Sequence, residues 1–260
     1  MTSQQQTAAP ALALSDIRQL ALRDLPALDM PKAPAVLGDL AHLWQWMTAA
    51  QNKSKPAIRH PRLSVFLSAH GSFTTLQQNL TALPKQLADD KTPLSLLAAQ
   101  QNADLQIYEL DLATPAGDIN RGPAMTEENA VQAIAYGMMS VQPGVDFLIL
   151  ATANPATPVL AEKIAAALGK GDDALDTLLV LGGFDLAACL GAALAARLAR
   201  VPVLLDDSAA IILPLLTALQ ENAGDHIRLA ADVLPQEMQS PAGIRAALAL
   251  SLLSALTQAV

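Results

Sequence analysis

The sequence has little of what secreted, membrane-spanning or nucleic-acid-binding proteins need. One cysteine, Cys189, among 260 residues excludes an intrachain disulfide and a cysteine-rich metal site. Acidic residues outnumber basic ones by 24 to 16, and the net charge of −8 argues against nucleic acid or an anionic membrane surface as a partner. Aromatic residues make up only 3%, which favours helices packed on a sheet over an all-β sandwich.

Long apolar runs and a leader-like segment are missing as well. No charge-free apolar run approaches the ~20 residues of a membrane-spanning helix, and the nearest candidate is residues 209–219. The opening MTSQQQTAAP has neither the basic region nor the apolar core of a secretory signal. We therefore expect a soluble, cytoplasmic protein with no membrane partner.

What the sequence does contain is an alternation of short apolar runs and helical patterns. With 52% hydrophobic residues, the chain can bury a sizeable core. Four runs suit buried strands, and amphipathic helical patterns lie between them. This order predicts an α/β fold, with a Rossmann-like parallel sheet, right-handed crossovers and flanking helices. The expected strands are residues 62–71, 105–112, 145–153 and 201–207, and the expected helices are residues 74–88, 126–139, 158–168 and 184–198.

The first 60 residues are expected to form a helical segment of their own. Residues 1–12 are polar or small and predict a flexible tail. Within residues 13–60, apolar side chains at steps of three and four, Trp44 among them, mark one face of a helix. Trp46 cannot share that face, so we expect one tryptophan to be partly exposed. We expect an α/β core of residues 61–235 to follow, and then a C-terminal helix within residues 236–260.

Ligands of such sheets bind outside the carboxyl ends of the strands, so residues at those ends are the candidates. His70 and Gly71 follow the first expected strand, and His70 could act as a general base, bind an anion, or only form hydrogen bonds within its loop. Thr152 ends the third strand. Asp206 and Ser208 follow the fourth.

Three further features have both a functional and a purely structural explanation. Gly182 and Gly183 precede a helix, where amides could hold a phosphate, although a glycine cap is the more frequent cause and no G-x-G-x-x-G accompanies them. Asp206 and Asp207 point to opposite sides if they lie on a strand, and a helix start capped by Asp207 or Ser208 explains them equally well. Thr126 suits a helix cap, and Met125 beside it carries no inferable chemistry.

Four stretches, in order, resemble the nicotinate-nucleotide:dimethylbenzimidazole phosphoribosyltransferases. Residues 30–71 are similar to that family's KPPGSLG, helix, P-x-I and strand ending in D-H-G. GPAMTEENAVQAIAYG is similar to its P-A-M-T-x-E-E-A motif. Residues 175–207 are similar to its GG-[FL]-E-I-A-A-x-x-G helix followed by V-P-V-x-L-D-G. AALALSLLSA resembles the apolar helix after its terminal L-G-E-G-T-G-A.

This resemblance implies an activity and an assembly. Enzymes of the family transfer phosphoribose from nicotinate mononucleotide to dimethylbenzimidazole, which gives the nucleotide that becomes the lower ligand of cobalamin. The resemblance also implies a homodimer and a small helical subdomain built from both chain ends beside the sheet. The partners are then a small-molecule nucleotide and an aromatic base. We expect no cofactor and no metal.

The sequence departs from the family where the family's chemistry lies. Aligning the closing helix places Ala242 at the family's general-base glutamate, and alanine cannot accept a proton. The family's G-E-M-G-I-G-N-T-T corresponds to residues 151–159, where Thr152 replaces the glutamate and two prolines remove amide donors. The segment with a phosphate-binding lysine is missing, and Lys170 is the only basic candidate nearby.

These matches and losses predict a divergent relative with a degenerate active site. No catalytic residue is assigned. Two alternatives stay open: an active transferase whose base has moved, with Glu237 as the substitute, or a non-catalytic ligand-binding or partner subunit. A scaffold for an unrelated ligand is a third, because folds do not fix functions. The candidate ligand-binding residues are His70, Gly71, Met125, Thr126, Thr152, Gly182, Gly183, Asp206 and Ser208.

Overall fold

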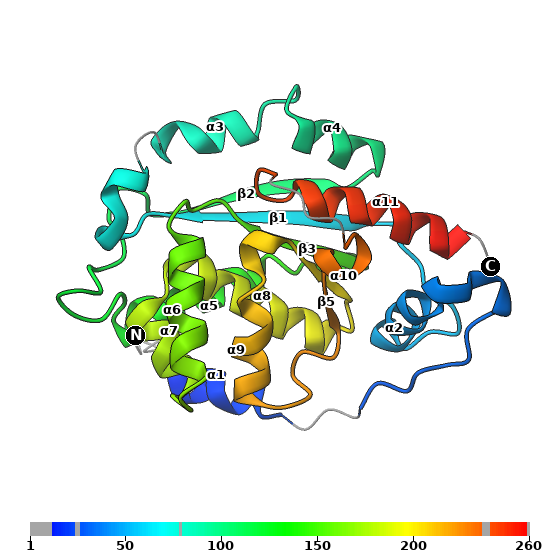
Figure 1. The fold of residues 1–260 in the computed structure, drawn as a ribbon, viewed down its shortest axis with the longest axis horizontal. Helices are drawn as coiled ribbons and strands as arrows, with labels where there is room; N and C mark the ends of the chain where they lie inside the picture. Colours follow the sequence, from blue (N-terminus) through cyan, green and yellow to red (C-terminus); the bar gives the residue numbers. More distant parts are fainter. Residues whose placement is uncertain (1–11, 24–26, 78–79, 236–239, 259–260) are drawn as a thin grey trace, which may run out of the picture.

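A five-stranded, all-parallel sheet forms the centre of the computed structural model, which describes residues 12–23, 27–77, 80–235 and 240–258 (Figure 1). The strand order is β2-β1-β3-β4-β5. Strand β2 lies on one side of β1, and the later strands extend the sheet on the other side, as in a doubly wound fold. The predicted fold class is confirmed. The strands are β1 (Pro61–Ser68), β2 (Asp104–Leu110), β3 (Phe147–Thr152), β4 (Val203–Leu205) and β5 (Ile227–Leu229).

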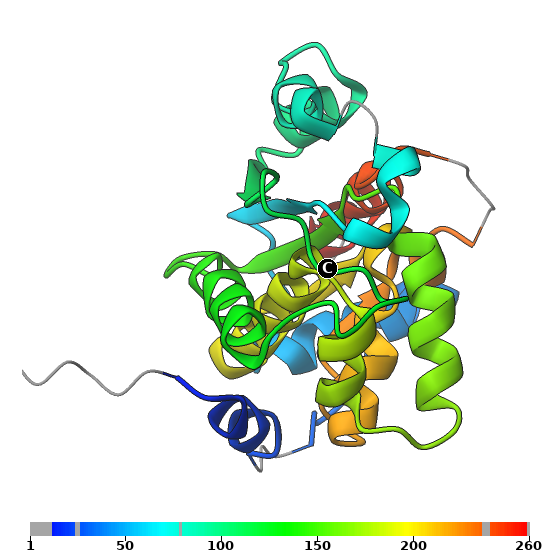
Figure 2. The same ribbon diagram turned by 90° about the vertical axis from the view of Figure 1, so that its left-hand side faces the viewer.

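Helices cover both faces of the sheet (Figures 1 and 2). In the part of the chain that the structure describes, none of them is long and apolar enough to cross a membrane. The α-helices are α1 (Leu14–Ala21), α2 (Ala41–Gln51), α3 (Leu83–Leu87), α4 (Pro93–Gln100), α5 (Glu127–Met139), α6 (Thr157–Leu168), α7 (Ala174–Leu181), α8 (Phe184–Ala199), α9 (Ile212–Leu219), α10 (Ala230–Val233) and α11 (Ile244–Gln258). The 3-10 turns are η1 (Ala35–Leu40), η2 (Gly71–Gln77), η3 (Leu80–Ala82) and η4 (Asp207–Ala209).

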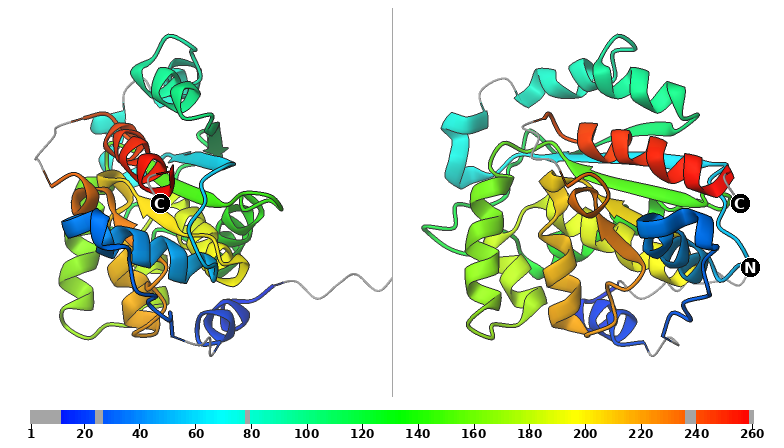
Figure 3. Two further views of the ribbon diagram at one scale, coloured as in Figure 1. Left: turned by 90° about the vertical axis from the view of Figure 1, so that its right-hand side faces the viewer. Right: turned by 45° about the vertical axis from the view of Figure 1, so that its right-hand side comes forward.

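The alternation of side chains along each strand divides the interior into two cores. On β3, Leu148 and Leu150 face a core shared with α5, α6, α7, α8 and α9. Phe147 and Ile149 face the other core, which they share with α2, α4 and α11. Helices α2 and α11, from opposite ends of the chain, therefore lie on the same side of the sheet (Figure 3), whereas α1 packs into the core on the other side.

The structure corrects three expectations about local structure. Trp44 and Trp46 are both buried, with 5% and 0% exposed surface, because Trp46 packs edge-on against Phe147 under the sheet. The expected helix of residues 74–88 is wrong: the described residues 74–77 and 80–88 form 3-10 turns and the short α3, and Pro84 is tolerated in α3 because it lies in the first turn. Strand β5 was not expected, since three residues are too few to show a period.

Helices α5 and α8 pack with their backbones almost in contact. A Cβ atom on Gly137 would lie 1.8 Å from the Ala188 carbonyl oxygen, and one on Gly191 would lie 1.9 Å from the Ile134 carbonyl oxygen. No side chain fits at either position, so both glycines are required for this crossing. The crossing fixes where α8 begins.

We predict that Gly137→Ala destabilises the fold by about 3 kcal/mol or more, because overpacking of a tight core typically costs ~1–3 kcal/mol and here the obstacle is backbone. Urea unfolding monitored by circular dichroism measures the change. Gly122→Ala is the matched control, since a Cβ at Gly122 meets nothing within 4 Å. Equal losses in the two variants would contradict the packing argument.

Candidate functional site

The carboxyl ends of β1, β3 and β4 meet where α8 begins, at the point where the strand order reverses. This is the edge at which doubly wound sheets bind ligands. The structure brings together most of the predicted residues there: His70 after β1, Thr152 at the end of β3, the Gly182–Gly183 turn, and Asp206 after β4. The side chains of His70, Thr152 and Asp206 are each hydrogen-bonded to a protein group.

His70 ties the end of β1 to the glycine turn. Its ring has no exposed surface, and Nε2 lies 3.0 Å from the Gly182 carbonyl oxygen. A carbonyl only accepts, so Nε2 carries the proton, and Nδ1 accepts the Ser72 N–H at 3.3 Å. Burial lowers the pKa of His70, against the raising effect of the Gly182 carbonyl. The neutral ring thus has both nitrogens occupied by the protein.

Gly71 and Gly183 are present because larger residues do not fit. The Gly71 N–H donates to the Ala116 carbonyl at 2.7 Å, and a Cβ there would lie 2.8 Å from the same oxygen. A Cβ on Gly183 would lie 2.7 Å from a carboxylate oxygen of Asp185. Both glycines are explained by close packing at the edge of the sheet.

Asp185, in the first turn of α8, is the one buried acid of this edge that sequence reasoning missed. It has no exposed surface. The Ser68 hydroxyl donates to Oδ1 at 2.6 Å and the Thr157 hydroxyl donates to Oδ2 at 3.2 Å. Burial raises the pKa of the Asp185 carboxyl, and the two hydroxyls act in the opposite direction. The available signal was an acid inside the otherwise apolar run FDLAACLGAALAA.

A second set of bonds joins β3 to β4. The Thr152 N–H donates to the Ser208 hydroxyl at 3.1 Å, and the Thr152 hydroxyl donates to the Ser208 carbonyl at 2.8 Å. Ser208 donates in turn to Asp206 Oδ2 at 2.8 Å. The Thr152 hydroxyl lies 3.4 Å from that of Thr157, which links this set to Asp185. Polar contacts therefore run from β1 across β3 to β4.

Asp206 is the cap of the turn η4, which corrects the expectation that Asp207 or Ser208 would cap it. Its carboxylate accepts from the Ser208 N–H and, through Oδ1, from the Ala246 N–H in the first turn of α11 at 3.3 Å. Asp207 instead forms an ion pair with Arg245 at 2.7 Å. The two aspartates thus serve α11 rather than a shared ligand.

The remaining candidates lie apart from this cluster or outside the described residues. Thr126 caps α5, as predicted, by accepting the Asn129 N–H at 3.2 Å, and Met125 is core. Lys170 lines a surface groove between α6 and α7. Ala242 is partly buried against the core beside α11. Glu237 lies outside the described residues.

A cavity lined by residues of α5 and by Phe184 lies at the start of α8. It has a volume of about 390 Å³, within the range of small-molecule sites. Half-exposed aromatic rings and amide side chains share its wall. It is lined by Leu110, Asp111, Thr114, Asn129, Gln132, Ala133, Tyr136 and Phe184. Among the described residues, no group of three or more His, Cys, Asp or Glu is arranged to hold a metal ion.

The fold and the site together define a doubly wound α/β protein with its ligand edge at the carboxyl ends of the strands. A sequence model of the phosphoribosyltransferase family matches residues 13–169 and 152–237. The chain therefore belongs to this phosphoribosyltransferase family. The two matches overlap at residues 152–169, which include most of residues 151–159, the stretch compared above with the family's glycine motif. Ala242 lies beyond the matched residues.

Relatives of known name support the same assignment. The nicotinate-nucleotide–dimethylbenzimidazole phosphoribosyltransferase of Rhizobium meliloti is 30% identical over 251 residues, covering 76% of this chain and 74% of that protein. The enzyme of the same name from Allorhizobium ampelinum is 28% identical, covering 83% and 78%. The crystal structure of CobT from Thermus thermophilus shares the fold, with a TM-score of 0.74 at 16% identity over 94% and 95% of the chains.

We predict that Asp185→Asn changes how stability depends on pH. The pKa of Asp185 is raised in the folded state. Between the unfolded and the folded pKa, the folded state therefore binds more protons, and the free energy of unfolding of the wild type falls as the pH rises through this interval. Asparagine cannot ionise, so the variant lacks this loss, worth about 1.4 kcal/mol per unit of pKa difference. Urea unfolding from about pH 4 to about pH 8 measures it.

The control for this comparison is Asp172→Asn at an exposed position. Its stability should change with pH in parallel with that of the wild type. Parallel curves for Asp185→Asn and the wild type would show that burial does not shift the Asp185 carboxyl.

Proposed function

We propose that this chain is a catalytically impaired phosphoribosyltransferase relative that keeps a scaffold for binding a nucleotide or an aromatic base. The observation that carries the proposal is the mutual pairing of polar groups at the carboxyl edge. Asp185 accepts from Ser68 and Thr157, and both nitrogens of His70 are bonded within the protein. Groups engaged in this way, in preformed internal bonds, give little to a reacting substrate.

The losses that the family resemblance identifies support the same proposal. Ala242 stands where the family has its base, and general-base catalysis contributes roughly 10²- to 10⁴-fold in rate. Pro155 and Pro158 replace amide donors of the glycine motif, and no counterpart of the phosphate lysine is assigned. The amide donors and the lysine would position the substrate and stabilise charge in the transition state. Their loss therefore removes more than the loss of the base alone would.

The cavity beside α5 is the binding place that we propose for a planar ring. Tyr136 and Phe184 offer aromatic faces, and Gln132 and Asn129 offer amide donors and acceptors around it. Aromatic pairs stack with gains of ~0.5–1.5 kcal/mol beyond burial. The relatives' names give nicotinate nucleotide and dimethylbenzimidazole as the first ligands to test.

We predict no turnover of nicotinate mononucleotide with dimethylbenzimidazole above the uncatalysed rate, together with binding of at least one of the two by calorimetry. The Rhizobium meliloti enzyme serves as the positive control in the chromatographic assay. Phe184→Ala should weaken binding of the aromatic ligand by about tenfold, from the loss of stacking and buried apolar surface. Leu96→Ala, an exposed position on α4, is the matched control.

Turnover by the wild type would overturn the impaired assignment. If Glu237→Gln then lowered that turnover by roughly 10²-fold or more, the active transferase with a relocated base would replace it. If neither ligand binds, the chain is instead a partner subunit or a scaffold for another ligand.

We also propose that residues 13–60 and 236–260 form a small helical subdomain beside a core of residues 61–235, and that two cytoplasmic chains form a homodimer. The contact of α2 with α11 supports the subdomain. Val36 and Met139 are the most exposed large apolar side chains among the described residues, and an obligate interface would cover such side chains.

We predict a sedimentation-equilibrium mass of about twice the chain mass of 27.1 kDa, because an obligate interface buries apolar surface that a monomer would expose. Met139→Lys should shift the population toward the monomer, and Lys163→Ala on α6 is the control. A wild-type monomer at micromolar concentration would contradict the homodimer.

A further inference from the structure

Strand β2 forms one edge of the sheet and pairs with β1 alone. Its register with β1 runs without interruption from Asp104 to Leu110, so no bulge bends it away from a neighbour. Among the described residues, no other backbone hydrogen bond reaches this strand. Every second N–H and carbonyl group of β2 therefore faces outward without a partner in the part of the chain that the structure describes.

The sequence of β2 does little to prevent pairing with another strand. Soluble proteins usually protect an edge strand by short length, proline, lysine or a bulge. The seven residues DLQIYEL contain neither proline nor lysine. Asp104 forms an ion pair with Arg62 at 2.6 Å, so Glu109 alone adds net charge to the strand. This edge is open to a partner strand over its whole length.

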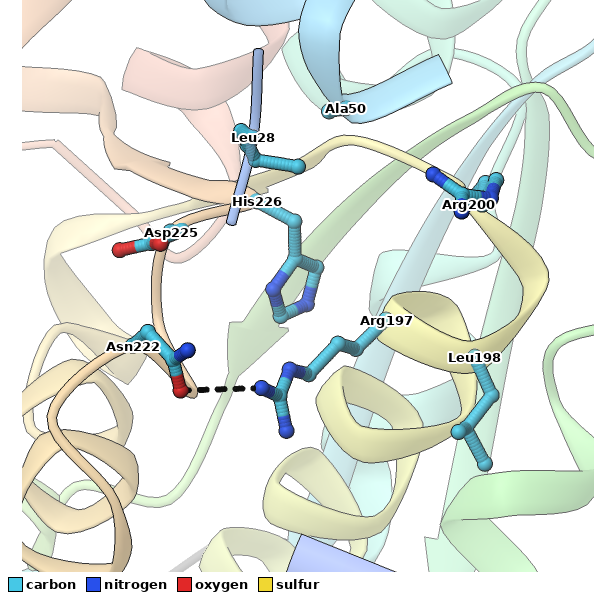
Figure 4. A pocket seen from close by; sticks show the side chains of 8 residues that line it. All are labelled: Leu28, Ala50, Arg197, Leu198, Arg200, Asn222, Asp225 and His226. Carbon is cyan, nitrogen blue, oxygen red and sulfur yellow. Dashed lines mark hydrogen bonds between the residues drawn. The ribbon is translucent and has the colours of Figure 1, made fainter. Parts of the chain in front are cut away.

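The opposite edge of the sheet offers far less. Strand β5 has three residues, and the segment before it is tied to α8. Arg197 donates to the Asn222 side-chain oxygen at 3.2 Å (Figure 4), and His226 Nε2 lies 2.9 Å from the Ala193 carbonyl oxygen. A second sheet can therefore be added more readily at β2 than at β5.

Apolar and aromatic side chains border β2 on the side of α5. The Tyr108 ring stacks on Phe66 of β1, with the ring centroids 5.0 Å apart, and lies nearly perpendicular to Tyr136 of α5 at 5.8 Å. Tyr136 and Met139, about one turn apart on α5, are 38% and 67% exposed. A strand added beside β2 would place its side chains next to these residues, and such cross-strand pairs stabilise a sheet.

The charges along this edge favour a second copy of the chain as the partner. Glu109 and Asp111 are exposed at the carboxyl end of β2. Arg59 and His60 are exposed just before β1, and His60 lines a cavity at the amino end of β2. Antiparallel pairing centred on Ile107, the middle residue of β2, brings the acidic end of one copy to the basic end of the other. It keeps the two Glu109 residues about 14 Å apart, beyond the ~8 Å over which exposed charges interact at physiological ionic strength.

We propose that β2 pairs antiparallel with β2 of a second copy of this chain, about a two-fold axis at Ile107, which joins two five-stranded sheets into one. All seven residues of each strand are then paired, and the closed symmetry leaves neither β2 free for a third chain. The first residues of the partner strand lie beside Leu110 and Asp111, which line the cavity at α5, so the second copy extends the wall of that cavity. The inference rests on the proposed homodimer and assigns its surface.

The first test is cross-linking between full-length chains. Cys189 has no exposed surface, so Ala103→Cys and Glu109→Cys each add one reactive thiol near an end of β2. In the proposed pair, positions 103 and 109 of different chains lie about 7 Å apart along the strands, whereas two copies of position 103 lie about 27 Å apart and two copies of position 109 about 14 Å.

After subunit exchange, we expect a short bis-maleimide to give about tenfold more covalent dimer in a mixture of the two variants than in either variant alone, because of these separations. A mixture of Glu109→Cys with Glu162→Cys, an exposed position on α6, is the matched control and should show no such excess.

Hydrogen exchange of the wild type provides a second measurement. The outward amides of β2 should exchange about tenfold more slowly at concentrations where the dimer predominates than in dilute protein, because pairing protects them. The amides of β5 should not change.

The outcomes separate this inference from the homodimer itself. A wild-type monomer in sedimentation would overturn both. A dimer whose β2 amides stay unprotected would leave the homodimer standing with another surface and overturn this inference alone. Cross-linking of Glu109→Cys alone as strong as that of the mixture would exclude the antiparallel pairing about Ile107.

Discussion

The contact between the backbones of α5 and α8 is the constraint on which the rest of the structure depends. Because Gly137 and Gly191 carry no side chains, the two helices approach until carbonyl and Cα atoms touch. This closeness places the start of α8 directly against the ends of β1 and β3. The turn at Gly182 can then accept from His70, and Asp185 can receive two hydroxyls. The polar contacts at the carboxyl edge of the sheet therefore depend on the apolar contact of α5 with α8, about two helical turns away.

The same geometry explains how internal hydrogen bonds hold the carboxyl edge of the sheet together. The buried side chains of His70, Thr152, Asp185 and Asp206 find partners inside the protein, whereas the side-chain amide nitrogen of Asn154, just after β3, has no partner among the described residues. Asp185 illustrates the balance. Its desolvation is unfavourable, yet hydroxyls from two other elements offset part of it and join them to α8. A site built from such internal bonds is stable whether or not substrate binds.

The sequence allowed the sheet, its parallel order and most of the helices to be predicted, because short apolar runs and amphipathic periods are local signals. The features that the sequence did not allow to be predicted also have physical reasons. Strand β5 has three residues, too few for a period. Trp46 is buried by Phe147, which lies about a hundred residues further along the chain. The pairing of Ser68 with Asp185 joins positions 117 residues apart, and no local pattern specifies such a contact.

Asp206 shows that an acidic residue at the ligand edge of the sheet can be needed for folding alone. Its carboxylate holds the turn η4 with one oxygen and the first turn of α11 with the other. Selection for folding alone would preserve this residue in a chain that had lost every substrate. The aspartate at this position is therefore explained by folding, and its presence is no sign that the chain binds a substrate there.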